Sequence, residues 1–201
     1  MNWQAWLITW LPYGLTLLIL FWLFTLTLRD GLTLRTAKIS LALILGITML
    51  TIGAKMTYLY LRLRGDQFSQ YLIPAYGENY YLRILWDLSQ PLLWSLLIGL
   101  GLVVVFLILR RILKSPLVDT TDFLVVMLAI IAVGPTNVLV LILGGFGLML
   151  LWQIFKIFSG QKISRLERLQ ITPFVLVVAM AVMVLSNFPF YFKFLNLLRL
   201  I

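Results

Sequence analysis

The residue in this chain that is best placed to do chemistry is Lys55, a lone cation inside a long apolar run. A charge within a membrane span is costly, and it usually faces the protein interior or a wet cavity. The apolar run that contains Lys55 ends at Leu61, and on a helix the two residues lie about 9 Å apart along the axis. A lysine stem extends about that far. Two interpretations stay open: a lysine that snorkels to the surface, and a lysine that contacts an anion in a polar cleft.

Two further polar groups interrupt the apolar sequence. The segment Gly134-Pro135-Thr136-Asn137 places a hydroxyl and an amide at a helix break, with an ordinary turn as the alternative. Asp30 and Asp122 fall at the predicted cytoplasmic ends of two spans. Two carboxylates from different helices share a proton and activate water in aspartyl proteolysis. The same acids also fit simpler roles, because Asp30 follows Arg29 and Asp122 begins a helix.

The composition excludes several classes of function. The chain has no histidine and no cysteine, which rules out a Ser-His-Asp triad, a thiol nucleophile, a disulfide and a zinc site built from those residues. We expect neither a metal nor a cofactor. Hydrophobic residues make up 62% of the chain and charged residues 11%, as in a helical membrane protein. The net charge of +9 lies mainly at span ends, which favours membrane phospholipid as a partner over nucleic acid.

These properties predict an all-α fold, a polytopic integral membrane helical bundle that forms a single transmembrane domain over residues 1–201. About six spans are predicted, at Trp6–Leu28, Ile39–Leu61, Pro91–Leu109, Val118–Val133, Val138–Phe158 and Ile171–Tyr191. Residues 62–90 have the mixed aromatic and polar composition of an interfacial loop or a surface-lying helix. The apolar stretch 123–158 is too long for one ordinary span, so we expect a hairpin at Gly134-Pro135, with a single kinked helix as the alternative.

The distribution of basic residues predicts the orientation. If the N-terminus is outside and the spans alternate, ten Lys and Arg residues lie inside and five outside. The positive-inside rule therefore places the N-terminus outside, and six spans return the C-terminus to that side. Five glycines indicate close helix packing: Gly99, Gly101, Gly144, Gly145 and Gly147.

The order of short motifs over residues 10–137 resembles the prolipoprotein diacylglyceryl transferase family. The matching segments are Trp10-Leu11-Pro12-Tyr13-Gly14-Leu15, Gly53-Ala54-Lys55-Met56-Thr57-Tyr58, Tyr81-Leu82-Arg83-Ile84-Leu85-Trp86, the basic link from Arg110 to Asp122, and Gly134-Pro135-Thr136-Asn137. The resemblance implies a bacterial inner-membrane protein with an outward-opening, phosphatidylglycerol-accessible groove. It places four lipid-binding residues near that groove: Tyr13, Lys55, Tyr58 and Asn137.

The chain departs from that family at the residues that carry the reaction. The family's His-Gly-Gly segment would fall near Trp94-Ser95-Leu96, and the arginine of its Gly-Arg-x-Gly-Asn motif has no counterpart at 134–137. Leu150 and Ile154 stand where later charges belong. The resemblance therefore implies the architecture and a lipid site, and it favours a divergent or inactive relative over a working diacylglyceryl transferase, with the catalytic residues unknown. Its partners would be phospholipid, a lipoprotein precursor or other membrane subunits.

Two other functions remain open from the sequence. Asp30 and Asp122 lie where prepilin-type membrane aspartyl peptidases keep their acids, although Val118-Asp119-Thr120-Thr121-Asp122 lacks the glycines of that family's motif. The scarcity of polar residues within the spans also fits a non-catalytic scaffold subunit of a membrane complex.

Overall fold

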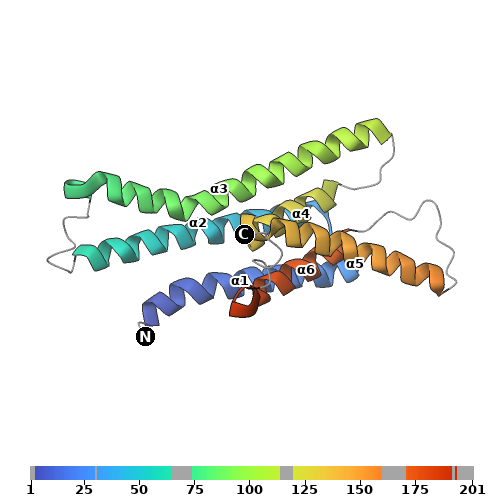
Figure 1. Cartoon of the computed structure of the whole chain (residues 1–201), viewed down its shortest axis with the longest axis horizontal. Helices are drawn as coiled ribbons and strands as arrows, with labels where there is room; N and C mark the ends of the chain where they lie inside the picture. The colour runs from blue at the N-terminus through green and yellow to red at the C-terminus, as the bar shows by residue number, and fades with distance from the viewer. Residues whose placement is uncertain are drawn as a thin grey trace.

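A computed structural model describes residues 3–29, 31–64, 74–113, 120–159, 171–191 and 193. Within these ranges the chain forms helices and turns but no strand, which confirms the all-α prediction. The elements are α1 (Trp3–Leu28), α2 (Leu34–Arg64), α3 (Pro74–Leu113), α4 (Thr120–Val133), the 3-10 turn η2 (Pro135–Asn137), α5 (Val138–Phe158) and α6 (Thr172–Leu185). Successive helices run in opposite directions along the long axis of the bundle (Figure 1).

Four of the described helices are long and apolar enough to cross a membrane. The qualifying segments are Leu7–Leu28, Leu34–Arg64, Leu82–Val105 and Pro135–Phe158. Helices α4 and α6 are also apolar but have 14 residues each, about 21 Å against a hydrocarbon thickness of about 30 Å. Many large apolar side chains lie on the outside of the bundle, including Leu50 and Phe158. Such a surface fits hydrocarbon rather than water as the surrounding solvent.

Helix α4 lies at the centre of the bundle. It packs against α2, α3 and α6, and its side chains Val125, Leu128, Ala129 and Ile130 are fully buried. Helix α1 packs on α2 and α6, whereas α5 packs mainly on α6. The short α4 therefore fixes the position of the turn that follows it.

Glycines allow close packing of α3 on α4 and of α5 on α6. A β-carbon at Gly99 would lie 3.0 Å from a methionine of α4, and one at Gly144 would lie 2.9 Å from a valine of α6. Gly145 faces a second valine of α6 at 3.1 Å. Close packing is confirmed at these three positions, but the prediction is wrong at Gly101 and Gly147, where a β-carbon would meet no atom within 4 Å.

The hairpin prediction is confirmed, because α4 and α5 run in opposite directions on either side of η2 (Figure 1). The bounds of α5 match the predicted fifth span. Three predicted boundaries are wrong. Helix α2 begins at Leu34 rather than Ile39. Helix α3 begins at Pro74 rather than Pro91, so residues 74–90 continue into the third span, and Pro91 lies inside a bent helix (Figure 1). Helix α6 ends at Leu185, six residues before the predicted end at Tyr191.

Candidate functional site

A cavity of about 420 Å³ lies among α1, α2, α3, α4 and α6. That volume falls in the range of small-molecule sites, about 300–1,000 Å³. The polar residues that line it are Thr9, Tyr13, Thr16, Thr48, Thr51, Lys55, Asp87 and Ser95. They come from the first three helices, while the last turn of α4, Gly134 and Met183 close the other side.

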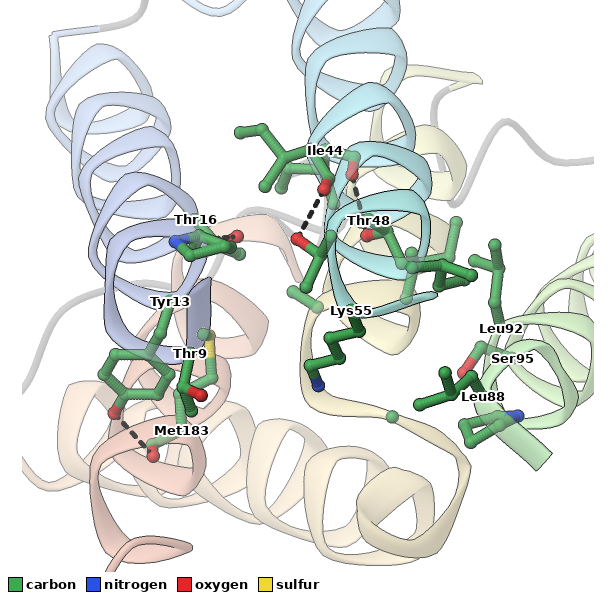
Figure 2. A pocket seen from close by; sticks show the side chains of 18 of the residues that line it. Thr9, Tyr13, Thr16, Ile44, Thr48, Lys55, Leu88, Leu92, Ser95 and Met183 are labelled. Carbon is green, nitrogen blue, oxygen red and sulfur yellow. Dashed lines mark hydrogen bonds between the residues drawn. The ribbon is translucent and has the colours of Figure 1, made fainter. Parts of the chain in front are cut away.

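Lys55 extends from α2 into the space between α1 and α3 (Figure 2). It shares one face of α2 with Thr48 and Thr51, because residues spaced by three and four lie above one another on a helix. Among the residues that the structure describes, none makes a hydrogen bond or an ion pair with Lys55. Lys55 thus brings to the cavity an ammonium group that forms no ion pair with a described side chain.

Three threonines make the lining rich in hydrogen-bond acceptors. Each donates its hydroxyl proton to a carbonyl one turn earlier in its own helix, a common arrangement for threonine in apolar helices. The bonds run from Thr16 to Pro12 (2.9 Å), from Thr48 to Ile44 (2.8 Å) and from Thr51 to Ile47 (2.7 Å). Because the protons are used within the helices, the hydroxyl oxygens can only accept further hydrogen bonds from a ligand.

The α3 wall carries the opposite charge. Asp87, Pro91 and Ser95 line the cavity at a spacing of four residues, so they share one face of the helix. Asp87 is exposed whereas Ser95 is fully buried, so the wall runs from the mouth of the cavity to its interior. Pro91 has no N–H, which leaves the backbone carbonyl of Asp87 without its usual helical donor.

The side of the cavity formed by the chain reversal depends on a glycine with positive φ and on a tyrosine. Gly134 has φ 82° and ψ 163°, a backbone conformation that residues other than glycine rarely adopt. The Tyr13 hydroxyl donates to the backbone carbonyl of Met183 over 2.7 Å (Figure 2). Tyr13 therefore ties α1 to the end of α6, and its only proton is committed to that bond.

The four predicted lipid-binding residues do not all meet at this cavity. Tyr13 and Lys55 line it, but Tyr58 and Asn137 are not among the lining residues. The Asn137 amide donates to the last carbonyl of α4 over 3.1 Å, and its oxygen accepts the hydroxyl of the buried Tyr191 at 2.8 Å. Asn137 thus stabilises the end of the hairpin.

The predicted acid pair is described only in part. Asp30 lies outside the described residues. Asp122, in the first turn of α4, accepts a hydrogen bond from the buried hydroxyl of Thr172 and so joins α4 to α6. Within the described ranges, no three acidic side chains gather as a metal site would need.

Comparison with known proteins adds no relative. No protein-family model matches the chain, and neither a curated protein nor a solved structure matches it.

Most of the polar residues that line the cavity were not predicted from the sequence, although the spacing of some of them is visible there. Thr48 and Thr51 precede Lys55 at intervals of seven and four, which predicts one polar face on an otherwise apolar helix. Asp87 and Ser95 also share one face of their helix, but their spacing does not indicate which helix that face meets. They follow a stretch of mixed composition, and only the packing of α3 brings them opposite α2.

Proposed function

We propose that this is an integral membrane protein that binds an anionic phospholipid, with Lys55 holding the phosphate of the head group. The observation that carries the proposal is the position of Lys55 on a 420 Å³ cavity, where it forms no ion pair with any described residue. A nearby anion strongly stabilises a charged lysine within a membrane span. Phosphate is a suitable anion, because lysine binds it as a point charge.

Phosphatidylglycerol is the lipid that we propose, on the resemblance to the diacylglyceryl transferases. The proposed activity is binding without transfer. Transfer needs a group that removes the thiol proton of the acceptor cysteine, and the chain has no histidine to do so. We expect no product from a lipobox peptide, and product formation that Lys55→Ala abolishes would contradict this view.

The proposed setting is the bacterial inner membrane, with all six helices inserted and the N-terminus outside. Two observations support it: the alternating helix directions and the excess of basic residues at the ends that would face the cytoplasm. This orientation places Lys55 in the outer half of the membrane. Bound lipid could then be presented to a lipoprotein precursor or to other membrane subunits. The hydrogen bond from Thr172 to Asp122 favours a structural role for this carboxylate over the peptidase alternative.

The proposal is tested by lipid retention on the purified protein. Lys55→Met removes the charge and keeps the stem, and we expect phosphatidylglycerol binding to fall about tenfold or more, as for the loss of a hydrogen bond to a charged group. Lys38→Met is the matched control, since Lys38 is an exposed lysine of the same helix that does not line the cavity. Native mass spectrometry from nanodiscs of mixed lipids measures both. Equal retention by the two variants would refute the proposal.

A further inference from the structure

The cavity has a second charged wall, formed by α3. A phosphate bound at Lys55 would give the carboxylate of that wall no partner. Lys55 of α2 and Asp87 of α3 both line the cavity, and they are the only charged residues among the described lining residues. In the part of the chain that the structure describes, they form no ion pair with each other or with other side chains. A ligand that satisfies both must carry a negative charge and, separately, a hydrogen-bond donor.

We propose that Asp87 recognises the part of the head group beyond the phosphate, so that the cavity selects phospholipids with a hydroxyl or primary ammonium donor there. This inference rests on the proposed function, because it takes Lys55 as the phosphate site. A phosphodiester that continues into such a group matches the two walls: phosphate at the ammonium of α2, and the donor at the carboxylate of α3. Phosphatidylglycerol offers hydroxyls and phosphatidylethanolamine offers an ammonium, whereas phosphatidic acid ends at its phosphate.

The rest of the lining favours the same assignment. The hydroxyls of Thr16, Thr48 and Thr51 donate within their helices, so they present acceptors to a ligand. Pro91 frees the carbonyl of Asp87, which adds a backbone acceptor beside the carboxylate. Apart from Lys55, these groups fit a ligand rich in donors and oppose a second anionic group.

Binding of three lipids to Asp87→Asn tests the inference. The amide keeps the shape of the carboxylate and removes its charge. We expect phosphatidylglycerol and phosphatidylethanolamine to bind about tenfold more weakly, as when a hydrogen bond to a charged group is lost. Phosphatidic acid should bind at least as well as before, because a like charge has been removed. Arg83→Gln is the control, since it removes an exposed charge one turn earlier on α3 and away from the cavity.

The experiment separates failure of the inference from failure of the proposed function. If Lys55→Met leaves all three lipids bound as in the parent chain, the proposed function falls and the inference falls with it. If Lys55→Met abolishes binding but Asp87→Asn weakens all three lipids equally, or none, only the assignment of Asp87 is overturned. A selective loss of phosphatidylethanolamine supports the assignment with an ammonium as the donor, and a selective loss of phosphatidylglycerol supports it with a hydroxyl. Melting temperatures of the variants confirm that each is folded.

Discussion

The contact between α5 and α6 is so close that a single methyl group should disturb it. A β-carbon at Gly144 would lie 2.9 Å and 3.3 Å from the two γ-carbons of Val178. Carbon atoms prefer separations of about 3.5–4.0 Å, so Gly144→Ala must displace one helix by about 0.6 Å or more. Val178 has little freedom to rotate away, because valine keeps one strongly preferred rotamer in a helix.

The magnitude follows from two opposing effects. Overpacking of this kind costs about 1–3 kcal/mol. Alanine also gains about 1 kcal/mol over glycine in helix propensity. Gly147→Ala receives only that gain, because a β-carbon there meets no atom within 4 Å. We therefore expect Gly144→Ala to be less stable than Gly147→Ala by about 1–3 kcal/mol.

Reversible unfolding in mixed detergent micelles, followed by circular dichroism, measures this difference. Val178→Ala should relieve the clash, so Gly144→Ala should cost less in that background than in the parent chain. Two results would refute the reasoning: equal stability of Gly144→Ala and Gly147→Ala, or no coupling between Gly144 and Val178. Either would mean that α5 and α6 are not packed at the distance described.

Two further predictions concern the hairpin and the topology. Gly134→Ala should destabilise the protein by about 1–3 kcal/mol, because alanine is strained at φ 82° and ψ 163°. Thr136→Ala, an exposed change in the same turn, is its control, and equal unfolding curves for the two would contradict the turn geometry. The chain has no cysteine, so single cysteines can report the proposed six-span orientation. Thr136→Cys should react with a membrane-impermeant maleimide on intact spheroplasts, and Ser159→Cys only after permeabilisation; labelling of Ser159→Cys on intact spheroplasts would overturn the orientation.

Where the sequence carries a local break, it predicts the helix boundary well. Helix α5 begins after Gly134-Pro135 and ends at Phe158, where the polar sequence Ser159-Gly160-Gln161-Lys162 follows, as expected from the residues themselves. A proline is ambiguous when it lies between a mixed segment and an apolar one. Pro91 reads as a helix start, but the structure has it inside α3, because proline is tolerated inside a long helix that bends.

Which helix faces are buried, and which residues meet at the cavity, depends on tertiary contacts that the sequence does not indicate. The six α-helices that the structure describes are apolar over most of their length, so no amphipathic pattern indicates which face of each is buried. Lys55 stood out because a cation is rare in such a run, and Tyr13 was expected beside it. The presence of Asp87 on the same cavity depends on how α3 packs, which leaves no trace in residue spacing. The early end of α6 depends on side chains as well, because Ser186 and Asn187 donate to the carbonyl of Met183.

The two short helices also explain how a polar cavity fits within an apolar bundle. Helices α4 and α6 are each about 21 Å long, and both end beside the cavity, so the carbonyls of their last turns need donors from outside the helix. Those carbonyls receive donors from other segments: the Asn137 amide reaches Val133, and the Tyr13 hydroxyl reaches Met183. With the backbone satisfied in this way, Lys55 is left as the charged donor that faces the cavity. An anionic head group drawn to Lys55 would therefore find few competing donors, which is the condition for a single phosphate to bind at one defined position.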